Sequence, residues 1–239
     1  MRLDRALVAA GLAESRARAQ ALIAAGVVRV GGRPAEKASA EVADGAALEV
    51  TGNPNPWVSR AALKLVHALD HFGISTAGRV ALDLGASTGG FTEVLLARGA
   101  AHVHAVDVGH GQLHPRLAGD PRVTLWEGVN ARALPSALPR PGIVTADLSF
   151  ISLTTALPPA LVLAAPDADL IALIKPQFEA GKGAVGKGVV RDPEVQAEVR
   201  ARIAAFLRDA GWSVTGQAES PIAGGDGNRE FLIAARKPA

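Results

Sequence analysis

The stretch "VALDLGASTGGF", Val80 to Phe91, decides the fold of this 239-residue chain. An apolar run typical of a buried strand is followed by small residues and glycines, and then by the start of a helix. Glycines allow tight turns and let a ligand approach the main chain closely. The stretch therefore predicts the first strand, turn and helix of a parallel α/β sheet with a ligand site at the turn. The alternative is a tight strand–helix turn without a ligand.

Further apolar runs continue the pattern, separated by helical or irregular segments as in a parallel sheet with crossovers. These runs are "AHVHAVDV", "RVTLWEG", "GIVTADLSF" and "DLIALIKP". A helix is expected from Pro193 to Asp209, followed by the runs "GWSVTGQAES" and "REFLIAARK". Their short connection predicts an antiparallel pair. The sequence thus predicts a Rossmann-like α/β fold with a seven-stranded sheet.

The N-terminal residues have a different rhythm and predict a small α+β domain over residues 1–50. Two amphipathic helices, with Ser15 as N-cap of the second and Gly11 and Gly26 at the C-terminal ends, precede short strands with Gly-Gly and Asp-Gly turns. Residues 51–58, with "TGNPNPW", form the expected linker. A helix from Ser59 to about Phe72 begins the large domain, residues 59–239.

Composition limits the function classes. The chain has no cysteine, which excludes disulfides and thiolate chemistry, and no apolar stretch suited to a membrane span. We expect a cytoplasmic protein without a metal site, because the six histidines lack carboxylates at ligand spacing. The net charge is only +2, yet arginines concentrate near the N-terminus, which fits either a solvated helix face or a nucleic-acid surface.

The glycine-rich turn differs from the G-x-G-x-x-G pattern of dinucleotide enzymes. D-x-G-x-x-x-G-G, with a second acid closing the next strand, resembles S-adenosylmethionine methyltransferases. By this resemblance the turn lines the methionine side, Asp107 holds the ribose diol, and Asn130 lies near the adenine. The implied cofactor-binding residues are Asp83, Gly85, Ser87, Gly89, Gly90, Phe91, Asp107, Asn130 and Asp147.

A lysine ends the apolar run of "DLIALIKPQFE", Asp169 to Glu179. Lysine is almost never fully buried unless it is paired, so Lys175 requires an explanation. Ligands bind beyond the carboxyl ends of parallel strands, where Asp147 also lies. Glu230, at the start of the antiparallel last strand, and Lys64, on the preceding helix, are expected at the same edge. Each alone could be an ordinary surface or turn residue.

Together, Lys64, Asp147, Lys175 and Glu230 resemble the Lys-Asp-Lys-Glu tetrad of ribose 2′-O-methyltransferases. The resemblance implies that Lys175 is the base, while the carboxylates orient the amine and the acceptor hydroxyl. Two absences favour a hydroxyl acceptor. The chain reads "DLSF" where amino-group methyltransferases usually carry Pro-Pro-aromatic, and it lacks the cysteine used for methylation at carbon five of pyrimidines.

The resemblance extends along essentially the whole chain through "NPWVSRAALKL", "DLGASTGGF", "ADLSFISL", "IKPQFEAGKGAVGKGVVRDP" and "GNREFL". With an N-terminal domain similar to the S-four-like RNA-binding fold, these motifs resemble the TlyA family. Its members join that domain to an FtsJ-like class I methyltransferase domain and modify cytidine ribose in ribosomal RNA; some carry the historical label haemolysin. The start "MRLDRAL" resembles the shorter subgroup, which by this resemblance modifies only 23S rRNA of the large subunit, whereas the longer subgroup modifies both subunits. 16S rRNA stays open as a further target.

The partner is therefore expected to be ribosomal RNA within a ribosomal subunit, held mainly through shape and phosphates. The expected RNA-binding residues are Arg2, Arg5, Arg16, Arg18, Arg33, Lys182 and Lys187. Two alternatives stay open. One is a non-catalytic RNA-binding factor for ribosome assembly, and the other is a membrane-active cytolysin.

Overall fold

The computed structural model describes residues 1–13, 15–43, 45–52, 56–181, 188–224 and 227–239. The contacts between Cα atoms divide the chain into two units, Met1–Pro56 and Trp57–Ala239. Each unit has its own hydrophobic core.

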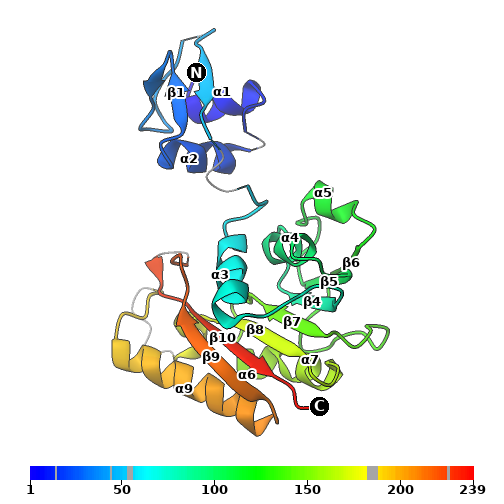
Figure 1. Ribbon diagram of the computed structural model, residues 1–239. Coiled ribbons are helices and arrows are strands. Elements are labelled where there is room, and N and C mark those ends of the chain that lie inside the picture. Colours follow the sequence, from blue (N-terminus) through cyan, green and yellow to red (C-terminus); the bar gives the residue numbers. More distant parts are fainter. Residues whose placement is uncertain (14, 44, 53–55, 182–187, 225–226) are drawn as a thin grey trace. The chain divides into compact units, whose positions relative to one another are not determined.

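The small unit packs two helices, α1 (Leu3–Ala9) and α2 (Arg16–Ala24), on a three-stranded sheet (Figure 1). The antiparallel strands lie in the order β2 (Arg33–Pro34), β1 (Val28–Val30) and β3 (Leu48–Val50). The predicted cap is confirmed, because Ser15 Oγ accepts a hydrogen bond of 3.2 Å from the Arg18 N–H. The apolar faces of both helices meet in one core, formed around Leu3, Leu7, Leu22, Ile23 and Val28.

The large unit contains the predicted seven-stranded sheet, in the order β6-β5-β4-β7-β8-β10-β9. Its strands are β4 (Val80–Leu84), β5 (His102–Asp107), β6 (Val123–Glu127), β7 (Ile143–Ala146), β8 (Asp169–Ile174), β9 (Ser213–Glu219) and β10 (Phe231–Arg236). The first five strands of this order are parallel, and β10 is antiparallel to both β8 and β9. The Rossmann-like class and the antiparallel final pair are thus confirmed.

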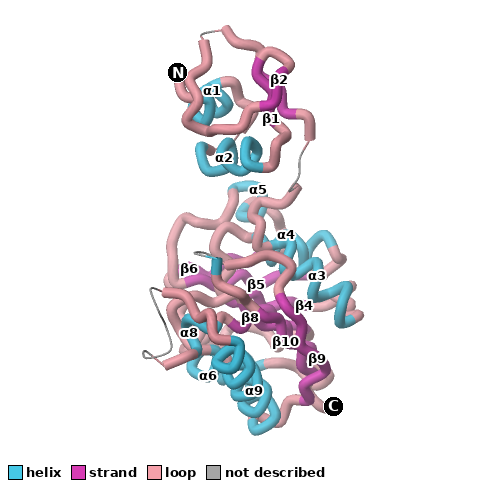
Figure 2. Tube along the Cα trace, turned by 90° about the vertical axis from the view of Figure 1, so that its left-hand side faces the viewer, coloured by secondary structure: helices cyan, strands magenta, loops and turns pink. Residues whose placement is uncertain are grey.

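Helices cover both faces of this sheet, as Figures 1 and 2 show. On one face lie α3 (Ala62–Phe72), α4 (Gly90–Ala97) and α5 (Pro115–Ala118). On the other lie α6 (Leu153–Ala156), α7 (Pro158–Leu163) and α9 (Pro193–Asp209), the last with the predicted bounds. A short helix, α8 (Pro176–Glu179), follows β8 directly. Because both faces are covered, every residue of β8 is buried.

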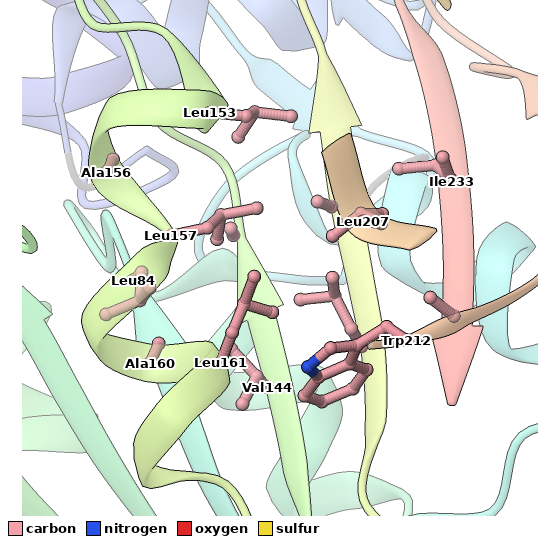
Figure 3. Close-up of a cluster of buried hydrophobic side chains, with 14 of the residues drawn as sticks. Leu84, Val144, Leu153, Ala156, Leu157, Ala160, Leu161, Leu207, Trp212 and Ile233 are labelled. Atoms are coloured by element: carbon pink, nitrogen blue, oxygen red, sulfur yellow. The ribbon is translucent and has the colours of Figure 1, made fainter. Parts of the chain in front are cut away.

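The larger core cluster lies between the sheet and α6, α7 and α9 (Figure 3). Trp212, which directly precedes β9, packs there beside Leu161 and Leu207. Burial of a leucine side chain contributes about 1.5–3 kcal/mol. Such packing along the strands holds their carboxyl ends in fixed positions, and the loops of the site begin at those ends.

One predicted boundary is wrong. The helix expected from Ser59 begins at Ala62, and residues 60–61 form a turn. Ser59 Oγ accepts a hydrogen bond from the Ala61 N–H at 3.0 Å, and a Cβ on Gly90 would lie only 2.9 Å from this oxygen. Ser59 therefore closes a turn against the start of α4 and does not cap α3.

Candidate active site

The carboxyl ends of the parallel strands β4, β5 and β7 surround a cavity of about 680 Å³. Its lining includes Gly85, Ser87, Val106, Asp107, Val108, Gln112, Asn130, Asp147, Leu148, Phe150 and Ile151. A smaller cavity of about 170 Å³ is lined by Ser59, Ala61, Gly85, Ala86, Ser87, Thr88, Gly90, Phe91, Asp147, Ser149 and Lys175. Gly85, Ser87, Asp147 and Ser149 belong to both linings, so the two cavities adjoin.

The glycine-rich turn brings β7 close to the end of β4. Gly85 has φ 80°, and a Cβ there would lie 2.7 Å from the main-chain oxygen of Asp147. Gly89 has φ 98°, and a Cβ there would collide with the side chain of Leu117. Substitution at either glycine would therefore disturb the backbone and the packing together. The structure places Gly85, Gly90 and Phe91 in the cavity walls, whereas Gly89 packs against α5.

Asp107 connects the end of β5 to this turn. Its Oδ2 accepts a hydrogen bond of 2.8 Å from the Ser87 N–H, and its Oδ1 accepts one of 2.8 Å from the Gly109 N–H. A carboxylate oxygen can accept more than one hydrogen bond, so Asp107 keeps capacity for a ligand in the cavity. Asn130 lies in the same lining, and its Oδ1 is oriented by the main chain and guanidinium of Arg132.

S-adenosylmethionine, expected from the sequence, fits these surroundings. The large cavity has the volume of a small-molecule site, and its wall combines apolar side chains with polar groups such as Asp107, Gln112 and Asn130. Asp107 could hold a ribose diol, and Asn130 could face a base. The polypeptide at Gly85 to Gly90 offers a surface of small residues beside the smaller cavity.

Asp83 is a different kind of residue from the other predicted cofactor contacts. It is fully buried within β4, where its carboxylate accepts hydrogen bonds from Thr92 Oγ1 at 2.7 Å and Thr145 Oγ1 at 3.0 Å. Burial, aided by the negative charge of Asp147, raises the pKa of Asp83 to about 6. Within the described part of the chain, Asp83 is not among the residues lining the two cavities. It ties β4 to α4 and β7 beneath them.

The four residues of the expected tetrad converge. Lys64 Nζ lies 2.6 Å from Glu230 Oε2 and 3.7 Å from Asp147 Oδ2. Lys175 Nζ lies 2.5 Å from Asp147 Oδ1, and it donates a hydrogen bond of 3.0 Å to Ser149 Oγ. The side chains of Lys64 and Lys175 are only 8% and 9% exposed.

The converging side chains form a continuous line from Glu230 through Lys64 and Asp147 to Lys175. Glu230 directly precedes β10, and the antiparallel direction of that strand brings it to this edge. The cavity linings include Asp147 and Lys175 but, among the residues the structure describes, neither Lys64 nor Glu230. Lys175 is therefore the amine at the cavity, with the other pair behind it.

Phe150 is a feature that the sequence did not indicate. Its side chain is 90% exposed on the wall of the large cavity, and its backbone has φ 64°, a conformation that bulky residues rarely adopt. The Phe178 ring lies 4.9 Å from the Phe150 ring. The sequence contained "DLSF", but nothing in it showed that this phenylalanine would face solvent beside a lysine.

The expected RNA-binding residues differ from one another in exposure and in their ion pairs. Arg2 and Arg16 both bond to the buried carboxylate of Asp4, each at 3.1 Å. Arg5 and Arg33 are exposed, and Arg18 is half-buried. The predicted residues Lys182 and Lys187 lie outside the described residues. Among the residues that are described, no group of three or more His, Cys, Asp or Glu could hold a metal ion, and no helix is long and apolar enough to cross a membrane.

Comparison with known proteins gives two matches to protein families. Residues 57–237 match the family described as FtsJ-like methyltransferase, and residues 1–48 match the S4 domain. The first match covers most of the chain and contains every residue that lines the two cavities.

Individual relatives span nearly the whole chain. The 16S/23S rRNA (cytidine-2'-O)-methyltransferase TlyA of Mycobacterium tuberculosis is 52% identical over 97% of this chain and 88% of its own length. Hemolysin A of Brachyspira hyodysenteriae is 39% identical over 97% of this chain and 98% of its own. A solved structure from Streptococcus thermophilus, whose description includes the word hemolysin, has a TM-score of 0.79 and 39% identity, covering 100% of this chain and 88% of its own.

Proposed function

This chain belongs to the TlyA family of FtsJ-like methyltransferases, its cofactor is S-adenosylmethionine, and from that premise we propose that it methylates a ribose 2′-hydroxyl of cytidine in ribosomal RNA. The TlyA relative at 52% identity is named for this reaction on both 16S and 23S rRNA. We propose 23S rRNA as a substrate, with 16S rRNA assayed beside it. The S4 domain match at residues 1–48 supports RNA as the partner, and such a substrate would be met in the cytoplasm.

The observation that carries the proposal is the buried lysine at the cavity wall. A ribose hydroxyl is a weak acid, so its methylation needs a group that removes the proton as the new bond forms. Lys175 Nζ is the amine beside the cavity, and Asp147 and Ser149 fix its position. S-adenosylmethionine supplies an electrophilic methyl group when it is bound.

In this mechanism Lys175 Nζ takes the proton from the 2′-hydroxyl. The ammonium group so formed is stabilised by Asp147 Oδ1 at 2.5 Å and by Ser149 Oγ at 3.0 Å. Lys64 Nζ forms a longer ion pair, of 3.7 Å, with the other oxygen of Asp147, and Glu230 balances the charge of Lys64. Asp147 is thus held from both sides, which orients the amine toward the acceptor.

Phe150 supports the choice of a nucleotide that leaves its base stack. An exposed aromatic ring on the cavity wall can stack on an unpaired base, and such stacking contributes about 1–3 kcal/mol. A ribose hydroxyl within a helix cannot enter a recessed site without local unstacking. We propose that Phe150 receives the base while the ribose lies at Lys175.

The experiment that tests the function is methyl transfer from labelled S-adenosylmethionine to purified ribosomal subunits that lack native methylation. The expected product is 2′-O-methylcytidine in 23S rRNA, and the small subunit is assayed separately. Cofactor and RNA binding without any product would instead favour an assembly factor. Leakage of lipid vesicles that persists in Lys175→Ala would favour a cytolysin.

A further inference from the structure

We propose that Glu179 is a positioning residue for methyl transfer, acting through the loop that carries Ser149 and Phe150. We call Asp147–Ser152 the rim loop, because it borders the large cavity between β7 and α6. The inference rests on the proposed function, since it assigns Glu179 a part in that reaction. Glu179 itself is not among the described residues that line the cavities.

The Glu179 carboxylate joins the segment after Lys175 to the end of the rim loop. It ends α8 and is only 8% exposed. Its Oε2 accepts a hydrogen bond of 2.6 Å from Ser152 Oγ, and its Oε1 accepts one of 2.7 Å from the Leu153 N–H. Both bonds are charge-assisted and shielded from water, which makes them strong.

The same short segment holds the rim loop at two further points. Lys175 Nζ donates to Ser149 Oγ, and the Phe178 ring lies against the Phe150 ring. Phe150 has φ 64°, which a bulky residue adopts only where the surroundings enforce it. The contact at Glu179 fixes the far end of the loop, so it determines where the strained residue and its exposed ring lie.

A purely structural role would be a helix cap. Ser152 already supplies a cap to α6, because its Oγ accepts from the Thr154 N–H at 3.2 Å. Removal of a cap would lower stability but would not act through Ser149 and Phe150. The two roles therefore differ in whether the effect of Glu179 depends on the rim loop side chains.

The variants are Glu179→Ala, which removes both bonds, and Glu179→Gln, which can keep them. The amide oxygen of glutamine can accept from the Leu153 N–H, and the Ser152 hydroxyl can accept from its amide group. The matched control is Asp169→Ala, since Asp169 is also a buried carboxylate with 8% exposure. It pairs with Arg79 at the opposite end of β8.

We expect Glu179→Ala to lower the single-turnover rate at saturating RNA by about 10- to 100-fold, since small misplacements near a reacting group have effects of this size. Glu179→Gln should retain most of the rate, and Asp169→Ala should keep it despite a lower melting temperature. Hydrogen exchange should show loss of protection at Leu153 in Glu179→Ala alone. The same fold-loss in Asp169→Ala would contradict the proposal.

The decisive comparison repeats Glu179→Ala in a Ser149→Ala/Phe150→Ala background. If Glu179 acts through the rim loop, its fold-effect should become much smaller there. An undiminished effect would overturn the proposal. If the wild-type protein transfers no methyl group, the proposed function fails. Hydrogen exchange at Leu153 then still tests the loop contact, and unchanged protection in Glu179→Ala would refute that contact.

Discussion

Each of the two units of this chain pairs two basic side chains with one aspartate. The two pairs differ in residue type, arginine in one and lysine in the other, and in how far the side chains are exposed to solvent. In the small unit, Arg2 and Arg16 share Asp4, and their side chains are 42% and 51% exposed. In the large unit, Lys64 and Lys175 share Asp147 and are nearly buried. The first pair presents charge to solvent, and the second places one buried amine, that of Lys175, at a cavity.

The chemistry of the two side chains explains the difference. Arginine stays protonated in proteins and offers a planar set of donors, which suits phosphate groups. Lysine can lose its proton in a buried site, which suits a base. In our proposal, the same arrangement of two basic side chains around one carboxylate therefore serves RNA binding in the small unit and proton removal in the large unit.

The largest expected effect comes from replacing Lys175. Lys175→Arg keeps the charge but removes the ability to act as a base, and Lys175→Met keeps the approximate length without the charge. Both should lower the single-turnover rate of methyl transfer by about 10²- to 10⁴-fold, the usual contribution of a general base. Binding of S-adenosylmethionine and of RNA should change little.

Lys237→Arg is the matched control, because the Lys237 ammonium also makes several hydrogen bonds, to main-chain oxygens at the C-terminal end of α7. It should leave the rate unchanged. If turnover in Lys175→Arg stays within tenfold of wild type, Lys175 is not the base. The lysine pair would then not differ in chemical role from the arginine pair.

Asp83 offers a contrast to Asp4, because it is a buried carboxylate whose hydrogen-bond partners are hydroxyl groups and not arginines. Hydrogen bonds, above all those from Arg2, lower the pKa of Asp4, whereas burial raises the pKa of Asp83 to about 6. A raised pKa means that the folded state binds the proton more tightly. The stability of the large unit should therefore fall as pH rises from about 4 to 6, by about 3 kcal/mol in all.

The measurement is urea unfolding of wild type and Asp83→Asn between pH 4 and pH 7, followed by tryptophan fluorescence. Asparagine has no proton to lose, so the stability of Asp83→Asn should not show this fall with rising pH. The free energy of unfolding of wild type should therefore decrease relative to that of Asp83→Asn up to about pH 6. The Asp4 contribution has the opposite sign, being lost as pH falls below the ordinary range for aspartate. Parallel curves for wild type and Asp83→Asn would contradict the raised pKa.

The sequence predicted the parts of the site that follow from strand order. Asp147 and Lys175 end neighbouring parallel strands, so their meeting at one edge could be expected from the parallel pattern. Lys64 and Glu230 could be included because a helix and an antiparallel strand return to that edge. These expectations depend on main-chain topology, which hydrophobic patterns express well.

Side-chain arrangements in loops could not be predicted in this way. The strained backbone at Phe150 and the contact between Glu179 and Ser152 depend on tertiary packing that has no sequence period. Asp83 belongs to the expected motif, but its hydrogen-bond partners Thr92 and Thr145 lie 9 and 62 residues away in the chain. Its burial against them could therefore not be predicted from the local sequence. Ser59, where the helix was expected to begin, is a residue type that often caps helices, but its hydroxyl forms a turn with the Ala61 N–H instead.

The smallest expected effect concerns Asp4, which fixes the positions of two arginines that we propose to bind RNA. Ordering a flexible side chain on binding costs about 0.5–1.5 kcal/mol, so its loss should weaken RNA affinity by roughly 2- to 13-fold per arginine. Asp4→Asn also removes a negative charge, which alone would strengthen binding. Glu49→Gln is the matched control, because it removes an exposed carboxylate from β3 of the same unit.

The difference between these two variants isolates the arrangement from the charge. Affinities measured by filter binding over a range of salt should rise slightly in Glu49→Gln and fall in Asp4→Asn, with kcat at saturating RNA unchanged in both. If Asp4→Asn instead bound as tightly as Glu49→Gln, Asp4 would only neutralise its arginines. The two aspartates would then have different roles, since only Asp147 would fix the positions of the basic side chains with which it forms ion pairs.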